Sequence, residues 1–149
     1  MTTYVSNRKA HFDYEMLEKF EAGLALFGYE VKAIRNGKAN LQGAYVIVRG
    51  SEAFLVNAAI TPYQEKNTPE SYDPERPRKL LLSRKELAKL EEKEAQKGLT
   101  LVPIRLYNSG RNIKLEFAIA RGKKKFDKRE SIKARDTKRD IQRTLKEQY

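Results

Sequence analysis

The basic segment at residues 121–149 limits what the rest of the chain can fold into. It carries 12 Lys and Arg against 5 Asp and Glu, which makes +7 of the chain's net charge of +11. Its large apolar side chains are only Phe126, Ile132, Ile141, Leu145 and Tyr149. Such a segment buries too little surface to offset the entropy lost on ordering, so we expect it to be mostly unfolded when alone in water. We therefore predict a folded domain at residues 1–120 and a basic tail at residues 121–149.

The net charge also indicates which kinds of molecule the protein can bind. A chain of 149 residues with a net charge of +11 usually meets nucleic acid or an anionic membrane. No apolar run approaches the ~20 residues of a membrane span, and the apolar strip of the tail is too thin to insert into a bilayer. Residues 1–10 lack the pattern of a secretory signal, and the absence of cysteine fits a reducing compartment. We expect a cytoplasmic protein that binds nucleic acid and no membrane.

Residues 12–26 alternate between apolar and polar side chains. Apolar residues occupy the even positions, with Glu18 as the exception. A period of two predicts a strand, and we expect this long strand to bend or bulge at Gly23. Residues 1–6 are short and polar, and we expect them to be frayed.

The middle of the chain predicts a short helix, a hairpin and a long loop. Residues 29–36 have helical spacing and end at Gly37, and their polar face offers Glu30, Lys32 and Arg35. Residues 44–49 and 53–60 read as strands of a hairpin joined by residues 50–52. Residues 61–78 contain four prolines, which predicts an irregular loop before a short strand at residues 80–82.

The last part of the folded domain predicts a capped helix and a second hairpin. Ser83 and Glu86 match a capping box, and the helix should run to Lys97 with Gly98 as its stop. Residues 99–107 and 113–120 read as strands around a turn at residues 108–110. The fold class is therefore mainly β with short helices, and a small closed antiparallel OB-like β-barrel plus a basic C-terminal tail accounts for the pattern.

The chemistry of an enzyme finds little support in this sequence. His11 is the single histidine and there is no cysteine, so these two residue types cannot build a metal site. Signatures of paired carboxylates, nucleophile elbows and glycine-rich phosphate loops are missing. We expect no cofactor and no catalysis.

Two interpretations of the tail stay open from its residues. Folded as a helix, it would gather basic side chains on one face, among them Arg135, Lys138 and Arg139. Residues 123–129 also place Phe126 between cations, an arrangement suited to stacking on a base while neighbours hold phosphates. The alternative is a solvated extension without a specific docking site.

Several stretches together resemble the small protein B family, the SsrA-binding proteins. They are residues 7–10 (NRKA), 20–24 (FEAGL), 28–32 (GYEVK), 35–41 (RNGKANL), 78–82 (RKLLL) and 122–129 (GKKKFDKR). The resemblance implies an oligonucleotide-binding barrel that grips the tRNA-like domain of transfer-messenger RNA (tmRNA). It also implies a tail that folds as a helix in the decoding centre and empty mRNA channel of a stalled ribosome, against small-subunit rRNA. Elongation factor Tu and alanyl-tRNA synthetase would act on the same RNA, and we expect the protein to be a monomer.

The resemblance also implies roles for particular residues. Family positions matching Asn7, Glu21, Leu81 and Lys114 are associated with RNA binding. With the basic side chains near them, the expected tmRNA interface is Asn7, Arg8, Lys9, Glu21, Lys32, Arg35, Leu81 and Lys114. The expected contacts with the ribosome are Lys123, Lys124, Phe126, Asp127, Lys128, Arg129, Arg135, Lys138 and Arg139.

For two of these residues, Glu21 and Leu81, the sequence also allows a purely structural role. Glu21 can accept a hydrogen bond from RNA or orient an arginine, or it can be an ordinary strand carboxylate. Leu81 can pack under an unstacked base, although a leucine in this run is more often part of a core. Phe126 stands where the family often has histidine, so it keeps a ring for stacking but has no imidazole donor.

Two other functions remain as alternatives at this point. The first is a general RNA-binding accessory of the ribosome without a dedicated tmRNA. The second is an enzyme acting on RNA.

Overall fold

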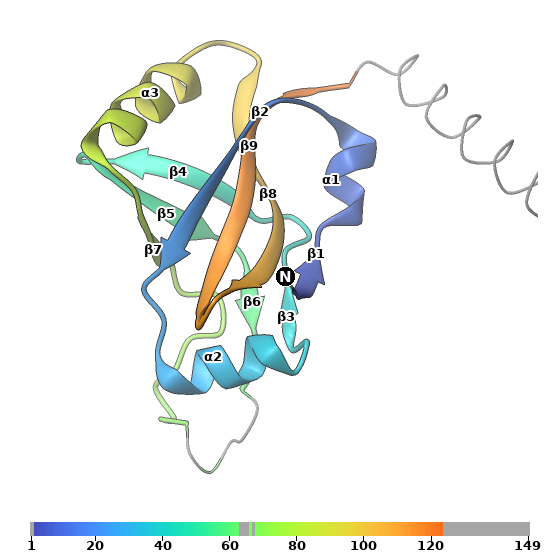
Figure 1. Cartoon of the computed structure of the whole chain (residues 1–149), viewed down its shortest axis with the longest axis vertical. Helices are drawn as coiled ribbons and strands as arrows, with labels where there is room; N and C mark the ends of the chain where they lie inside the picture. Colours follow the sequence, from blue (N-terminus) through green and yellow to red (C-terminus); the bar gives the residue numbers. More distant parts are fainter. Residues whose placement is uncertain (1, 63–65, 67, 124–149) are drawn as a thin grey trace, which may run out of the picture.

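The computed structural model describes residues 2–62, 66 and 68–123 (Figure 1). The predicted ribosome contacts from Lys124 to Arg139 therefore lie outside the described residues. In chain order the elements are β1 (Thr3–Ser6), α1 (Arg8–Asp13), β2 (Tyr14–Leu24), α2 (Gly28–Arg35), β3 (Ala39–Asn40), β4 (Tyr45–Arg49), β5 (Glu52–Val56), β6 (Ala59–Ile60), β7 (Arg78–Leu81), α3 (Arg84–Glu94), β8 (Leu99–Ser109) and β9 (Asn112–Gly122).

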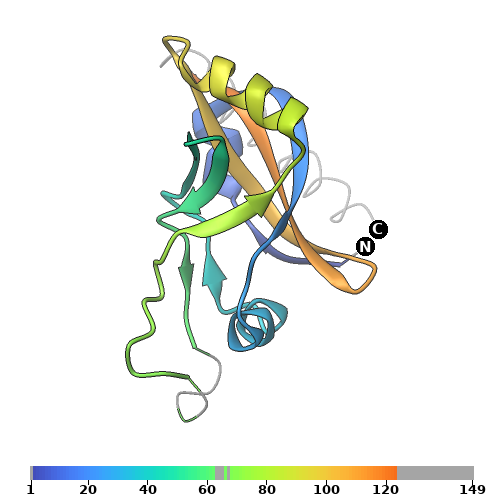
Figure 2. The ribbon, with the colours of Figure 1, turned by 90° about the vertical axis from the view of Figure 1, so that its left-hand side faces the viewer.

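Six of the described strands form a closed antiparallel ring. Hydrogen bonding runs from β8 through β4, β5, β7, β2 and β9 and returns to β8, while β1 pairs with residues 105–107 of β8. β3 and β6 form a separate pair near α2, and α3 lies at the opposite end of the molecule from α2 (Figures 1 and 2). The predicted fold class, mainly β with short helices and a closed antiparallel arrangement, is confirmed. Closure leaves few open strand edges.

The hairpins and helix ends follow the local signals of the sequence. Gly50 and Ser51 join β4 to β5 with φ of 58° and 63°, the positive values that a two-residue turn needs to match strand twist. Ser83 Oγ accepts from the Glu86 main-chain N–H at 3.2 Å, and Glu86 accepts from the Ser83 N–H at 3.3 Å, so the capping box is confirmed. Gly37 follows the end of α2 with a φ of 72°.

Four predicted boundaries were wrong. Residues 3–6 form β1 rather than a frayed end, and residues 12 and 13, predicted to begin the long strand, belong to α1. The predicted strand 53–60 is divided into β5 and β6 at Asn57, which has a φ of 61°. The helix expected to reach Lys97 ends at Glu94. For β1 the reason is its pairing with β8, a segment about 100 residues away that a local pattern cannot reveal.

The bulge in β2 lies at Leu17 rather than at Gly23. Met16 pairs with Ala120 and Glu18 with Ile119, so Leu17 is the extra residue. An extra residue reverses which face of the sheet the following side chains occupy. Met16 accordingly packs in an outer cluster, whereas Phe20 packs against the inner core.

A second bulge does the same in β8, where Ile104 is extra between Pro103 and Arg105. Before it, Val102 faces outward; after it, Leu106 faces the inner core. The outer cluster is small and lies against α1, and it consists of Ala10, Val102 and Ala120 with Tyr14 and Met16 packed against it. The outer surface of the sheet is therefore apolar near α1. Beyond the bulges, a different set of side chains from β2 and β8 faces outward.

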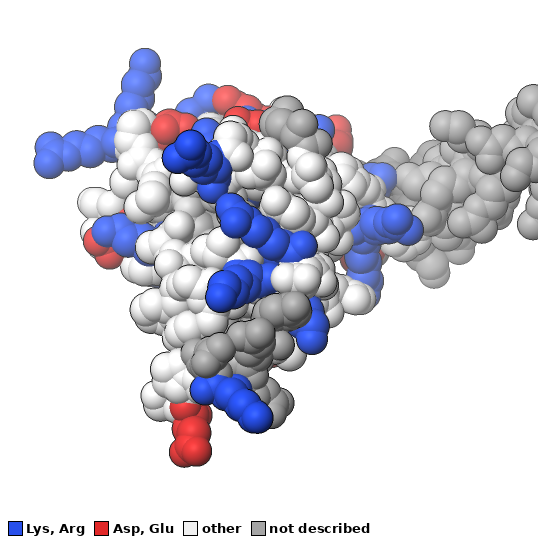
Figure 3. Space-filling model, turned by 60° about the horizontal axis from the view of Figure 1, so that its bottom comes forward, with Lys and Arg blue, Asp and Glu red and all other residues white. Residues whose placement is uncertain are grey.

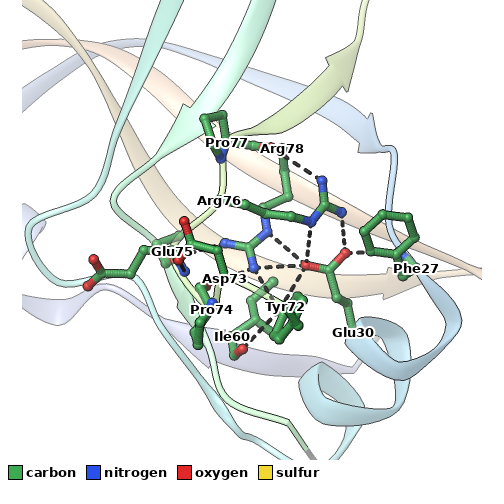
Figure 4. Close-up of polar contacts among 11 residues, drawn as sticks. Phe27, Glu30, Ile60, Tyr72, Asp73, Pro74, Glu75, Arg76, Pro77 and Arg78 are labelled. Carbon is green, nitrogen blue, oxygen red and sulfur yellow. Dashed lines mark hydrogen bonds and ion pairs between the residues drawn. The ribbon is translucent and has the colours of Figure 1, made fainter. Parts of the chain in front are cut away.

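Glu30 is buried, which corrects its predicted place on the polar face of α2. Its carboxylate and the Arg78 guanidinium are both 0% exposed and form an ion pair of 2.8 Å. Arg76 forms a second ion pair with it, and the Tyr72 hydroxyl donates to it at 3.0 Å (Figure 4). The Phe27 main-chain N–H donates to it at 2.9 Å. This network ties the start of α2 to the proline-rich segment that precedes β7.

The environment of Glu30 favours its ionised form. Burial alone would raise its pKa, but hydrogen bonds from Arg76, from the Phe27 main chain and from Arg78 outweigh that effect, so the pKa lies below its ordinary value. Arg78 also donates to the carbonyls of Ala58 at 2.6 Å and Pro74 at 2.8 Å. The buried charges are thus fully paired and hydrogen-bonded.

Replacing Glu30 with Gln should destabilise the fold by about 3–5 kcal/mol, because it leaves buried guanidinium charge without its partner. Urea unfolding at pH 7 measures this change. The matched control is Glu18→Gln, which removes an exposed ion pair to Lys89 of 2.6 Å and should cost about 1 kcal/mol or less.

The pH dependence of unfolding checks the same prediction. Because the folded-state pKa of Glu30 is lowered, its carboxylate contributes stability that is fully present above the unfolded value near 4.5 and is lost as pH falls through the folded-state pKa. The Glu30→Gln variant should lose less stability than the wild type across that acid range. Equal acid dependence in both proteins would contradict the assigned role of Glu30.

Candidate nucleic-acid interface

One row of residues crosses the outer face of β7, β2, β9 and β8 beyond the bulges. Leu81 is opposite Gly23, Gly23 is opposite Lys114, and Lys114 is opposite Tyr107. Leu81 lies over the glycine, since a Cβ built at Gly23 would be 3.4 Å from Leu81 Cδ1. A leucine and a lysine from different strands are thereby brought together across a residue without a side chain.

A second, charged row lies beside the first. Glu21 is directly opposite Glu116, and Glu116 is opposite Arg105. Arg105 reaches Glu116 at 3.4 Å and donates to the Thr3 hydroxyl at 2.9 Å. Two carboxylates side by side repel each other, and Arg105 balances the charge of Glu116.

The first row borders a hollow of about 290 Å³ with apolar and cationic walls. Its apolar lining comes from Leu24, Leu26, Val31, Leu81 and Ile113, and its polar lining from Arg111, Asn112 and Lys114. Apolar surface beside cations suits an unstacked base with its phosphate. The hollow can hold one such group of a nucleic acid.

The C-terminal end of α2 adds basic side chains next to this hollow. Arg35 Nη2 donates to the Arg111 carbonyl at 3.2 Å, and Lys32 is exposed on the same helix. Figure 3 shows the end of the molecule that carries α2: basic side chains run across the middle of this face, and acidic ones lie at its edges. The face has the charge expected for a phosphate backbone.

Five of the predicted tmRNA-binding residues fall in this region. Glu21, Leu81 and Lys114 share the outer face of the sheet, and Lys32 and Arg35 lie on α2. Leu81 is 58% exposed, so the interpretation of this residue as a core leucine is wrong. Leu80, its neighbour, takes the core position at 2% exposure.

The other three predicted residues lie at the α1 end of the sheet. Asn7 is 6% exposed, and its amide donates to the carbonyls of Pro103 at 2.9 Å and Leu41 at 3.3 Å. The amide nitrogen therefore holds the chain together, and only the carbonyl oxygen could serve a ligand. Arg8 and Lys9 are exposed on α1, and Lys9 lines a separate cavity of about 400 Å³.

The root of the tail is anchored beside the same helix. The Lys123 main-chain N–H donates to the Asp13 carbonyl at 2.8 Å, and Lys123 Nζ donates to the His11 carbonyl at 3.0 Å. β9 continues to Gly122. Lys123 therefore lies beside α1, at the other end of β9 from Lys114.

Sequence reasoning missed Arg105, Tyr107 and Arg111, which the structure places among the predicted residues. No local motif marks them, because Arg105 and Tyr107 are placed by the register of β8 against β9 and Arg111 lies in the turn between these strands. Burial and the nearby Glu21 carboxylate raise the pKa of Tyr107 to about 12. Tyr107 therefore stays a neutral hydrogen-bond donor at physiological pH.

Residues 2–62, 66 and 68–123 also bear on metal and membrane sites. Within these residues, no three His, Cys, Asp or Glu side chains lie close enough to hold a metal ion. None of the helices there has the length and apolar character needed to cross a membrane.

Comparison with known proteins gives consistent matches over most of the chain. The model of the family described as "SmpB protein" matches residues 4–147. A protein of Gloeobacter violaceus named SsrA-binding protein is 52% identical over 95% of this chain and 93% of its own length. A protein of the same name from Acaryochloris marina is 54% identical over 94% and 91%.

A solved structure also matches. A chain from the work "tmRNA-SmpB: a journey to the center of the bacterial ribosome" has a TM-score of 0.68 and 42% identity, covering 86% of this chain and 93% of that chain. Sequence and fold therefore point to the same family.

Neighbouring leucines on β7 test the assignment of the exposed face. Leu80→Ala should destabilise the fold by about 2–5 kcal/mol because it opens a cavity in the core. Leu81→Ala should cost about 1 kcal/mol or less, since its side chain is already in water. Urea unfolding of the two variants measures the difference, and equal losses would show that Leu81 is a structural residue.

Proposed function

This chain belongs to the SmpB protein family, and on that premise we propose that it binds the tRNA-like domain of tmRNA and delivers this RNA to stalled ribosomes. There it supports trans-translation, in which the nascent peptide is tagged and the ribosome is released. The observation that carries the proposal for the site is the hollow beside Lys114, where an exposed leucine lies next to cations. Relatives with the name SsrA-binding protein support the identity of the RNA.

The folded domain selects the RNA by shape and by a few contacts. Residues 1–120 carry 19 Lys and Arg against 15 Asp and Glu, too small an excess for binding by bulk charge alone. Lys114 and Arg111 would hold phosphates at the mouth of the hollow, Leu81 would pack under an unstacked base, and Glu21 would accept from an RNA hydroxyl or amine. Lys32 and Arg35 continue the phosphate track onto α2.

A second contact region is proposed at α1. Arg8 and Lys9 are exposed there and Lys123 is anchored beside them. These side chains lie at the far end of the sheet from the hollow, so they can meet a different part of the RNA or of the ribosome. Asn7 supports this region mainly by holding α1 against β8.

The tail is proposed to act on the ribosome rather than on free tmRNA. Residues 121–149 carry +7 of the chain's net charge of +11, which suits rRNA around an empty mRNA channel. Within the tail, Phe126 would stack in the decoding centre, and the cationic residues from Lys123 to Arg139 would follow the rRNA.

Elongation factor Tu and alanyl-tRNA synthetase join the process through the shared RNA, and the cytoplasm is the place where all of these partners meet. We infer no catalytic step for this chain itself, since its proposed work is binding and delivery.

Lys114→Ala should weaken binding to the tRNA-like domain by about 1 kcal/mol, roughly fivefold, and should lower the salt slope of the affinity by about one. Fluorescence anisotropy with labelled RNA at several salt concentrations measures both. Lys85→Ala on α3, at the other end of the molecule from α2, is the matched control and should bind as the wild type does. Equal displacement of the labelled RNA by unrelated hairpins would instead favour a general RNA-binding accessory.

Removing residues 124–149 should leave affinity for the free tRNA-like domain nearly unchanged and abolish peptide tagging, because the tail's proposed target is the ribosome. Anisotropy and an in vitro tagging assay on stalled ribosomes measure the two activities. Restoring the tail with its Lys and Arg replaced by Gln serves as the control for length and should not restore tagging. Loss of both activities together would refute this division of labour.

A further inference from the structure

The hydroxyl of Tyr107 is buried without a hydrogen-bond partner. The residue is 0% exposed, and its hydroxyl is the one buried side-chain polar atom in the described part of the chain that lacks a partner. Leaving a buried donor unsatisfied costs free energy, and phenylalanine would fill the same space without that cost. The hydroxyl therefore requires an explanation other than stability.

Neighbouring groups already have partners of their own. Arg105 lies 4.2 Å from the centre of the Tyr107 ring, but its guanidinium donates to Glu116 and Thr3. A guanidinium has no acceptor to offer a hydroxyl. Arg105 thus holds the ring in place by its face and leaves the hydroxyl unbonded.

Glu21 is the acceptor that this hydroxyl can serve. Glu21 and Tyr107 lie on the same outer face on either side of β9, since Glu21 is opposite Glu116 and Tyr107 is opposite Lys114. The charged groups near the hydroxyl are Glu21, Arg105 and Glu116. Glu116 is paired with Arg105, whereas Glu21 lies directly opposite Glu116 with a like charge. A carboxylate in that place needs a donor to hold it in one orientation.

We propose that Tyr107 is a positioning residue for RNA recognition: its hydroxyl donates to one oxygen of Glu21 in the complex, and the other oxygen accepts from a hydroxyl or amino group of the RNA. This inference rests on the proposed function and extends it to a residue that touches no RNA. In the free protein Glu21 acts on the hydroxyl without completing a hydrogen bond to it, and that bond is completed when RNA closes over Glu21. The Tyr107 hydroxyl therefore lowers the stability of the free protein and fixes the orientation of the Glu21 carboxylate in the complex.

The test compares Tyr107→Phe with the wild type in two measurements. Affinity for the tRNA-like domain should fall roughly fivefold to tenfold, as for the loss of one hydrogen bond to a charged group. The melting temperature should stay equal or rise, because the variant removes an unsatisfied buried hydroxyl. Tyr45→Phe, a tyrosine that is 42% exposed on β4, is the matched control and should change neither quantity.

A double-mutant cycle with Glu21→Ala shows whether Tyr107 acts through Glu21. In the Glu21→Ala background, Tyr107→Phe should weaken binding less than about twofold. Additive losses would overturn the inference, and so would a lower melting temperature of Tyr107→Phe. Wild-type affinity of Tyr107→Phe alongside weak binding by Glu21→Ala would overturn the inference and leave the proposed function standing. A wild-type protein that does not bind the tRNA-like domain would overturn both.

Discussion

Two extra residues, Leu17 in β2 and Ile104 in β8, determine which side chains the ring of strands turns inward. Without the bulge at Leu17, the even-numbered residues that follow Met16 would stay on the outer face, and Phe20 would be there instead of in the core. With both bulges, the outer face is apolar under α1 and becomes polar where Glu21, Arg105 and Lys114 lie. One sheet can therefore hold a helix at one end and present the proposed RNA-binding surface at the other.

The buried network around Glu30 places the second part of that surface. It fixes the start of α2 to Arg76, Arg78 and Tyr72, so the other end of α2 comes to lie beside the turn that carries Arg111. A buried ion pair adds little net stability compared with apolar packing, but it specifies one arrangement because each misplaced partner is costly. The hollow thus has one wall from the sheet and one from α2, and the ion pairs of Glu30 fix the position of α2 relative to the sheet.

The two basic regions of the chain suit different tasks. On the folded domain, cations are few and sit beside apolar surface, which is the combination that recognises a shaped RNA. Residues 121–149 carry most of the net positive charge, and Lys123 near their start is anchored to α1. The separation of Lys123 from Lys114, at opposite ends of β9, allows the domain to keep its RNA while the tail meets another partner.

Local signals in the sequence determined the hairpins, the capped helix, the long β2 strand and the charge of the tail, because turn residues, caps and side-chain periods act within a few positions. The resemblance of its motifs also led to the family and to Glu21, Leu81 and Lys114. Only the tertiary structure decided that Glu30 and Asn7 are buried, that Leu81 faces water, and that Arg105 and Tyr107 lie beside Glu21. The physical reason is that alternation defines two faces of a strand without saying which one is inside. That choice depends on bulges and on pairing between segments distant in the chain.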